Sequence, residues 1–521
     1  IVDGRLGIDF RFSRAVMDTD RVRALAAGVE HRLASAAGVP SRYAAARVAP
    51  EELDALLARI RERDGRTPSD VYELTPMQAG MLFHGLYDTK GSIYFEQFSF
   101  VIEEQIDASA LRAAWQQIVD RHDVFRTAFF WEGLSRPLQA VFDDVAVPWH
   151  EEDLSHLSAE DRAAALERLR ADDIEQGFDL TRAPLSRFVL AKLGAGQYFF
   201  LWSQHHLLLD GWSLHHVFEE AFTLYREIAA GRRLTLPASP SFARFIEWLH
   251  RQERSAGETR THWQRVLGGF VTPTPLPLAR AAAVEPETRN YRFREIELPL
   301  SADRTRALVE FARRERLTVA TVIQGLWALF LSRATGERDV VFGATVSGRS
   351  EDIADVDEMV GLLINGLPIR ARVDERRSPG EWLRELQDQM ALAQSFSYTP
   401  LVDIQAWSDL PAGSNLFNTL VVFENYPLDP HRQTQIANLR VRDLRIVEQT
   451  NFPLLFVIFP GEQLTLRLTF DPRMFDEQAI EAELGHLAEM LGSLCTPGTG
   501  RIADVAMLGE RERAEVVDEC N

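Results

Sequence analysis

The sequence is poor in cysteine, and nothing in it has the residue spacing of a metal site. Its two cysteines, Cys495 and Cys520, both lie near the C-terminal end, and no His-Glu-x-x-His string occurs. Paired cysteines or closely spaced histidines are the usual marks of a zinc site or a disulfide framework. We therefore expect neither a bound metal nor a disulfide scaffold, and the cysteine content fits the reducing cytoplasm.

Long apolar segments and an excess of positive charge are also missing. No signal peptide is visible, nor any apolar run long enough to span a membrane. With 57 lysines and arginines against 77 aspartates and glutamates, the net charge is −20. A surface of this sign repels polyanions, so nucleic acid and anionic membranes are poor candidates for the main partner.

What the sequence does have is enough material for large cores. Its 521 residues, 46% of them hydrophobic, suffice for two or three domain-sized units. The chain begins with Ile1 and not with methionine, so we expect it to be part of a longer protein.

Two adjacent histidines, His205 and His206, stand where a predicted strand ends and a helix begins. The strand is predicted over the aromatic segment 198–202, and apolar residues at helical spacing predict a helix over 214–230. Neighbouring residues on a strand point to opposite faces, so one histidine can line a cavity while the other packs. A neutral histidine at the edge of a cavity can take a proton from a nucleophile near pH 7.

The residues after the histidines favour a tight turn into the helix. Gly211 permits a sharp backbone turn, and Ser213 is predicted to cap the helix. Asp210 could orient a histidine, or it could hold the loop by pairing with an arginine. The alternative is that the histidines are core or metal-binding residues, but only one further histidine pair follows, His215 and His216 on the predicted helix.

Residues 205–213, His-His-Leu-Leu-Leu-Asp-Gly-Trp-Ser, resemble a known signature. It is the HHxxxDGxS motif of the condensation domains of nonribosomal peptide synthetases, which are relatives of chloramphenicol acetyltransferase. Other segments resemble the family's remaining motifs in the family's order, so the resemblance covers residues 70–515. These segments are 72–84, 121–129, 241–248, 360–370, 397–401 and 450–454, and residues 417–427 are predicted to be a strand and loop that reach toward the other lobe.

The resemblance implies an α/β (α+β) fold. Two chloramphenicol-acetyltransferase-like lobes would form a V-shaped pseudo-dimer with an active-site tunnel between them. The residue pattern agrees, because strands and covering helices alternate in both halves of the chain. We expect the N-terminal lobe of the condensation domain at residues 70–235 and its C-terminal lobe at 236–510.

The two ends of the chain resemble parts of neighbouring domains. Residues 1–37 repeat the strand-then-helix pattern of residues 464–494 and resemble the C-terminal tail of a preceding epimerization or condensation-like domain. An independent strand–helix decoration is the alternative. Residues 38–69 are predicted to be a linker, and residues 511–521 resemble the linker toward an adenylation domain.

The first motif also points to a subtype. Its sequence Thr-Pro-Met-Gln-Ala-Gly-Met at 75–81 is similar to the first motif of domains that accept a donor residue of D configuration. An epimerization domain just upstream would supply such a donor. We therefore expect the D-donor, L-acceptor subtype.

The activity that the resemblance implies is peptide-bond formation. The donor is an aminoacyl or peptidyl thioester on an upstream carrier protein, and the nucleophile is the α-amine of an aminoacyl thioester on a downstream carrier. Both arrive on phosphopantetheine arms, so the domain itself needs no bound cofactor. His206 is expected to be the general base or to position the amine, His205 to support it, and the Gly211 N–H to stabilise the oxyanion or line the entry.

Charged residues are expected to hold this site together. In the family the aspartate is structural and pairs with an arginine of the other lobe, so Arg349 is the expected partner of Asp210, with Arg370 in reserve. Arg126 is expected to be structural and could brace the catalytic loop. Three more residues are expected to line the channel: Trp212, Ser213 and Asn418.

Other functions stay open as alternatives. An epimerase of the same superfamily usually carries a Glu-Gly-His-Gly-Arg string, whereas residues 345–350 are Thr-Val-Ser-Gly-Arg-Ser. A CoA-dependent acyltransferase would not explain the flanking segments, and a non-catalytic docking platform typically lacks the intact histidine signature. A dual epimerase–condensation domain is rejected, because His84 has no neighbouring histidine.

Overall fold

The computed structural model describes residues 43–87, 93–279, 293–411, 413–424, 435–436, 439–509 and 512–514, together with Val22 and Val29. The domain tail expected at residues 1–37 lies outside this description apart from those two valines, as does most of the linker expected at 511–521.

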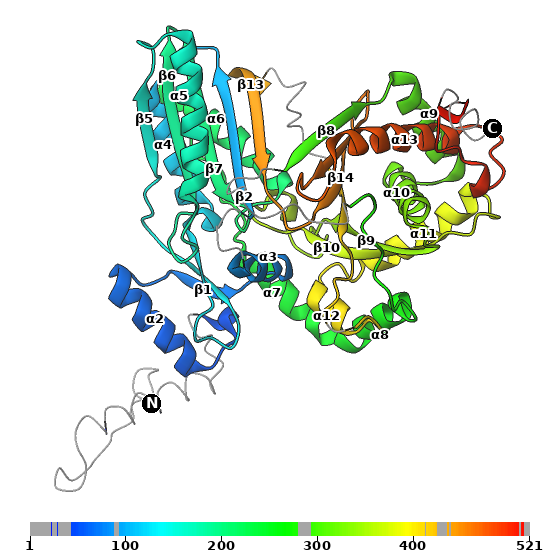
Figure 1. Cartoon of the computed structure of the whole chain (residues 1–521). Helices are drawn as coiled ribbons and strands as arrows, with labels where there is room; N and C mark the ends of the chain where they lie inside the picture. The colour runs from blue at the N-terminus through cyan, green and yellow to red at the C-terminus, as the bar shows by residue number, and fades with distance from the viewer. Residues whose placement is uncertain are drawn as a thin grey trace.

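The first half of the chain forms a main sheet with helices packed on it (Figure 1). Two helices then lead toward the second half. The elements are α2 (Pro50–Asp64), β1 (Asp70–Glu73), α3 (Pro76–Tyr87), β2 (Phe95–Ile102), α4 (Ala108–Arg121), β3 (Thr127–Phe130), β4 (Leu138–Val141), β5 (Trp149–Asp153), α5 (Ala159–Gln176), β6 (Ser186–Gly194), β7 (Gln197–His205), α6 (Gly211–Ala229), α7 (Ala243–Gln252) and α8 (Ala256–Leu267).

The second half repeats this build, and the two halves meet at an angle (Figure 1). The mixture of strands and helices confirms the predicted α/β class. The elements are β8 (Arg294–Pro299), α9 (Ala302–Glu315), α10 (Val319–Thr335), β9 (Asp339–Val346), β10 (Asn365–Arg372), α11 (Pro379–Gln394), α12 (Leu401–Ala406), β11 (Thr419–Phe423), β12 (Gln435–Ile436), β13 (Leu439–Glu448), β14 (Leu454–Phe459), β15 (Thr465–Phe470) and α13 (Glu477–Cys495).

Each half is built on a six-stranded sheet, and the second half contributes strands β12 and β13 to the first half's sheet. The orders are β12-β13-β2-β7-β6-β5 and β10-β9-β11-β14-β15-β8, beside a small sheet β1-β4-β3. Although β13 comes late in the chain, it runs antiparallel to β2 in the first sheet (Figure 1, orange beside blue). The register sets Glu448 directly opposite Glu96. The second half therefore contributes a side chain to the first half's sheet.

Aromatic side chains fix the strand that carries the histidines. The ring of Trp115, on α4, lies 4.5 Å from that of Phe188 and 5.0 Å from that of Trp202 on β7. Phe218, on α6, meets Trp202 edge-on at 5.0 Å, and all four rings are buried. Tilted and edge-on pairs of this kind add stability beyond the burial of their area. The cluster locks β7 against α6 and so fixes the turn between them.

Helix α10 forms the centre of the second half. Every residue from Thr321 to Ser332 is buried, as expected for a helix without a polar face. Among the described residues no single helix is long and apolar enough to cross a membrane. Helices α9 and α10 reach that length and composition only together, and a bend of 102° separates them.

The loop between β9 and β10 also joins the two halves. Its side chains Ile353, Met359, Leu362 and Leu363 are buried in the first half's hydrophobic core. The halves are thus connected by a shared core in addition to the pairing of β13 with β2.

Gly343, on β9, is expected to tolerate no side chain. A Cβ at this position would lie 2.3 Å from a ring carbon of Phe417 and 2.8 Å from a methyl carbon of Leu420. Overpacking of this kind costs about 1–3 kcal/mol. We expect Gly343→Ala to lower the Tm in scanning calorimetry, whereas Gly485→Ala, in open space on α13, should leave it unchanged or raise it. An unaltered Tm for Gly343→Ala would contradict this packing.

Candidate active site

A cavity of about 320 Å³ lies between the two halves. The first half lines it with α3, the start of β2 and the turn after β7. The second half lines it with residues of β9, β11, β13 and β14. Of the residues that the sequence singled out, this cavity is lined by His206, Asp210, Gly211, Trp212 and Arg349.

His206 directly follows β7 and presents its ring to the cavity. Its backbone N–H donates to the carbonyl of Tyr94 at 2.8 Å, and its Nδ1 lies 2.8 Å from the carbonyl oxygen of Leu209. A carbonyl can only accept, so Nδ1 carries a proton in this contact and Nε2 is left as the nitrogen that can accept one. The turn itself therefore selects the tautomer that a proton-accepting histidine requires.

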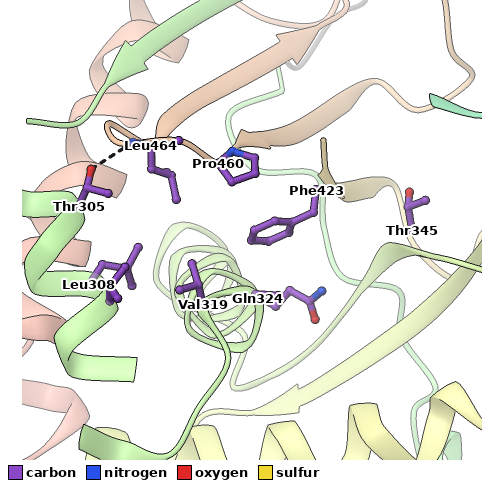
Figure 2. A pocket seen from close by; sticks show the side chains of 11 residues that line it. Thr305, Leu308, Val319, Gln324, Thr345, Phe423, Pro460 and Leu464 are labelled. Carbon is purple, nitrogen blue, oxygen red and sulfur yellow. Dashed lines mark hydrogen bonds between the residues drawn. The ribbon is translucent and has the colours of Figure 1, made fainter. Parts of the chain in front are cut away.

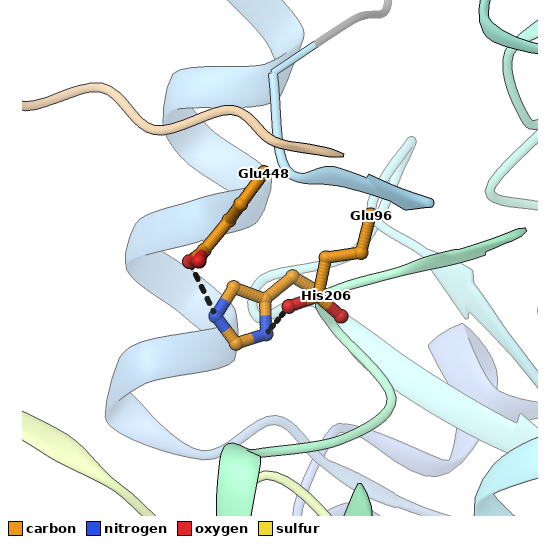
Figure 3. A group of neighbouring side chains, drawn as sticks. All are labelled: Glu96, His206 and Glu448. Atoms are coloured by element: carbon orange, nitrogen blue, oxygen red, sulfur yellow. Dashed lines mark ion pairs between the residues drawn. The ribbon is translucent and has the colours of Figure 1, made fainter. Parts of the chain in front are cut away.

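Two glutamates lie on either side of the His206 ring (Figure 3). An oxygen of Glu96 is 3.4 Å from Nδ1, and an oxygen of Glu448 is 3.6 Å from Nε2. Glu96 is buried, and its other oxygen accepts a hydrogen bond of 2.7 Å from the amide of Gln204. The side chain of Glu448 is 41% exposed, so this carboxylate connects the histidine with solvent.

The charges of this cluster set its proton affinity. Burial alone would lower the pKa of His206, but the carboxylates of Glu96 and Glu448 outweigh burial and raise its pKa above the usual value. Burial raises the pKa of Glu96, with Glu448 adding to the rise and His206 opposing it. The imidazole therefore keeps its proton to a higher pH than a free histidine does.

His205 has the opposite environment. The residue is buried, its Nδ1 accepts a hydrogen bond of 3.2 Å from the Leu207 N–H, and its ring packs against Tyr94. Burial, with a smaller contribution from His206, lowers the pKa of His205 to about 3. His205 is thus a neutral packing residue near pH 7, which suits a supporting part.

Asp210 connects the histidine turn to the second half. It is 1% exposed, and its Oδ1 lies 3.1 Å from an Arg349 nitrogen and accepts bonds from the N–H and hydroxyl of Ser213. Its Oδ2 accepts a bond of 3.0 Å from the Leu363 N–H. The Arg349 guanidinium is itself buried and donates to two backbone carbonyls of the same loop. Both charges are therefore paired and hydrogen-bonded, as buried charges must be.

The start of α6 differs from the prediction. The helix begins at Gly211 with Asp210 as its N-cap, so the prediction that Ser213 caps it is wrong. The expectation that Ser213 lines the channel is also wrong, because its hydroxyl is buried between Asp210 and the backbone of Gly361. Trp212, a 45% exposed residue, lines the cavity, and its indole N–H donates to the Asp357 carbonyl.

Two further arginines serve other contacts. Arg126 donates to Asp123 and to the backbone carbonyls of Val119 and Phe142, so it does not brace the catalytic loop as expected. Arg370 binds Asp339 through bonds of 2.8 and 2.6 Å, so the reserve partner for Asp210 is not used. Each arginine thus pairs with a carboxylate of its own half of the chain.

Asn418 does not line the cavity either. Its side-chain oxygen accepts a hydrogen bond from Asn415, and the cavity wall is formed by its near neighbours Phe417 and Leu420. The expectation of a carboxamide pointing into the channel is therefore wrong, because apolar side chains occupy the cavity-facing positions at this end of β11.

A second cavity, of about 360 Å³, lies in the second half between α9, α10 and the β14–β15 turn (Figure 2). Apolar side chains, threonines and Gln324 line it, and it shares Thr345 and Phe423 with the cavity between the halves. Because no ionisable side chain lines it, it offers no group for proton transfer near pH 7.

Glu96, His206 and Glu448 also form the one group of three or more His, Cys, Asp or Glu residues in the described chain whose ligand-type atoms all come within 4.8 Å of one another. Attraction between the imidazole and the two carboxylates, which raise its pKa, accounts for this approach without an ion. The expected absence of a bound metal stays a prediction.

Neither glutamate of this cluster was predicted from the sequence. Glu96 stands in a strand whose residues are all buried, and a charge in such a strand was a usable signal. Glu448 offered no comparable signal, because its position depends on β13 joining the sheet of the other half.

Asp210→Ala is expected to destabilise the protein strongly. It removes the N-cap of α6 and leaves the buried Arg349 guanidinium unpaired, and breaking a buried ion pair costs about 3–5 kcal/mol. Urea unfolding should show this loss, while Asp303→Ala, whose carboxylate is exposed on α9, should change little. A soluble, equally stable but inactive Asp210→Ala protein would point to a direct catalytic role instead.

Comparison with known proteins places the chain in a family. A family profile described as "Condensation domain" matches residues 68–517. The chain is 38% identical over 475 residues to a linear gramicidin synthase from Brevibacillus parabrevis, covering 90% of this chain and 6% of that protein. It is 32% identical over 456 residues to a plipastatin synthase from Bacillus subtilis, covering 87% and 18%. The chain thus spans a small part of these relatives.

Solved structures confirm the expected chloramphenicol-acetyltransferase-like fold. The starter condensation domain of rhizomide synthetase, in a complex with C8-CoA and Leu-SNAC, aligns with a TM-score of 0.70 at 20% identity, covering 84% of this chain and 98% of that one. The first condensation domain of the calcium-dependent antibiotic synthetase gives 0.68 at 22% identity, covering 84% and 100%. With the profile match, these observations show that the chain belongs to the condensation-domain family of nonribosomal peptide synthetases, enzymes that form amide bonds.

Proposed function

We propose that this chain joins two carrier-bound substrates by a peptide bond. The donor is an aminoacyl or peptidyl thioester on an upstream carrier protein, and the acceptor is the α-amine of an aminoacyl thioester on a downstream carrier, each on a phosphopantetheine arm. The observation that carries this proposal is the position of His206, whose Nε2 faces a cavity lined by both halves.

The reaction needs alignment and the management of protons. The amine attacks the thioester carbon, a C–N bond forms, the C–S bond breaks, the amine loses a proton and the leaving thiolate gains one. Holding both reactants in one cavity can lower the barrier by several kcal/mol. His206 either takes the proton at Nε2 or positions the amine. Gly211, at the positive end of the α6 dipole, offers its N–H to the oxyanion.

The donor is proposed to have the D configuration. This assignment of the donor configuration rests on the motif sequence at residues 75–81 and on the resemblance of residues 1–37 to the end of an epimerization domain. An epimerization domain upstream and an adenylation domain downstream are proposed as neighbours in one longer chain. Carrier proteins loaded with the same donor in either configuration test the subtype, and faster condensation of the L-donor contradicts it.

One experiment separates this function from its alternatives. Donor- and acceptor-loaded carrier proteins are mixed with the protein, and the products are identified by mass spectrometry. A dipeptide on the downstream carrier supports condensation. An inverted α-carbon on one carrier would indicate an epimerase, and acyl transfer from CoA would indicate a free-standing acyltransferase. The absence of any product would indicate a docking platform.

His206→Ala is expected to fold and to lose condensation. Loss of a positioned base lowers rates by about 10²–10⁴-fold. The ring is at the cavity surface, so circular dichroism should show a folded protein, while the Tm should fall somewhat because Glu96 and Glu448 lose the imidazole between them. Product formation is measured by mass spectrometry under single-turnover conditions. Near-normal condensation by this variant would exclude both the base and the positioning role.

Glu96→Gln is expected to shift the pH dependence of the reaction. Glu96 raises the pKa of His206, so removing its charge lowers that pKa. If neutral His206 is the active form, the rate rises as the ring loses its proton, and the rise moves to lower pH in the variant. The rate is followed from pH 5 to 9, with NMR titration of the His206 ring. An unmoved profile would contradict the coupling between the two residues.

A further inference from the structure

Glu448 reaches the active site from the other half of the chain. It is the last residue of β13, the strand that the second half contributes to the first sheet, and it stands directly opposite Glu96 on β2. Residues directly opposite in an antiparallel pair share one face, and both carboxylates line the cavity. The side chain of Glu96 is 7% exposed and that of Glu448 is 41% exposed.

This arrangement calls for a cation. Like charges directly opposite each other on neighbouring strands destabilise a sheet unless a positive group lies between them. The His206 ring lies between them, 3.4 Å from Glu96 and 3.6 Å from Glu448. Both carboxylates share this one imidazole, and Glu448, the more exposed of the two, keeps a side open to the cavity and to solvent. Glu448 therefore has room for a cationic partner.

Glu448 differs from the other carboxylates of the cavity. Glu295 lines the cavity but is paired with Arg467 at 3.5 Å, and Glu424 lines it outside the cluster of Glu96, His206 and Glu448. The Arg349 guanidinium is held by Asp210. Glu448 is the cavity-lining carboxylate beside the nitrogen that can accept a proton.

We propose that Glu448 binds the α-ammonium group of the acceptor substrate and places its nitrogen beside Nε2 of His206. This rests on the proposed function, because it assigns one end of the cavity to the acceptor. The ammonium gives one proton to Nε2 or to the Glu448 carboxylate and becomes the neutral amine that attacks the thioester. The half-exposed carboxylate then returns the proton to water.

Glu448→Gln tests this assignment, because it keeps the shape of the side chain and removes the charge. The KM for an acceptor, leucyl-N-acetylcysteamine, should rise about 10- to 100-fold, the loss expected for a hydrogen bond between charged groups. The KM for the donor-loaded carrier should not change. Glu448→Asp should recover part of the acceptor KM, and Glu481→Gln, exposed on α13, should match the wild type. An unchanged acceptor KM, or equal rises for donor and acceptor, overturns the proposal.

A binding measurement separates this proposal from the condensation reaction itself. Calorimetry compares leucine N-(2-acetamidoethyl)amide with 4-methylpentanoic acid N-(2-acetamidoethyl)amide, which differ only in the α-amine. The wild type should prefer the amine, and Glu448→Gln should lose this preference. A wild type without the preference overturns the proposal. A preference without any dipeptide product rejects the proposed function and keeps the amine site. A preference abolished by EDTA and restored by Zn²⁺ shows that a metal ion holds the amine, which also overturns it.

Discussion

The active site depends on one buried ion pair between the halves, that of Asp210 and Arg349. The carboxylate caps α6, ties down Ser213 and receives the Leu363 N–H, so it fixes both the helix after the histidines and the loop facing them. An isolated charge in this interior would be very costly, and each partner makes the burial of the other tolerable. The position of His206 follows from this pair, because the same turn supplies the Leu209 carbonyl that orients the ring.

The two adjacent histidines show how strongly surroundings decide chemistry. His205 is enclosed and its pKa falls, whereas His206 has two carboxylates within 3.6 Å and its pKa rises. The alternation of side chains along a strand creates this difference, since neighbouring residues face different environments. The raised pKa of His206 also bears on mechanism: below that pKa the ring can accept a proton only after it has released one, and Glu448 links the ring to solvent.

Much of this could be predicted where the cause is local. Periodicity gave the strand at 198–202, now inside β7, and the helix after the histidines, and a buried aspartate correctly implied an arginine partner. Errors arose where contacts decide between equivalent local choices. Asp210 and Ser213 are both good caps, and only the neighbouring loop shows that the hydroxyl is needed elsewhere. Glu448 could not be predicted, because the pairing of β13 with β2, more than 300 residues earlier in the chain, leaves no local sequence pattern.

Strand β13 also governs how the halves can move. β13 is bonded along β2, while β14, which begins at Leu454, belongs to the other sheet. Only residues 449–453 bridge the two sheets at this point. A rotation that widened the cavity would therefore have to be absorbed by this short bridge and by the β9–β10 loop, whose side chains are buried in the first half's core. Glu448 would travel with His206, because the two residues belong to hydrogen-bonded segments of the same sheet. Substrate entry could then reshape the far wall of the cavity while the carboxylate and the imidazole keep their distance.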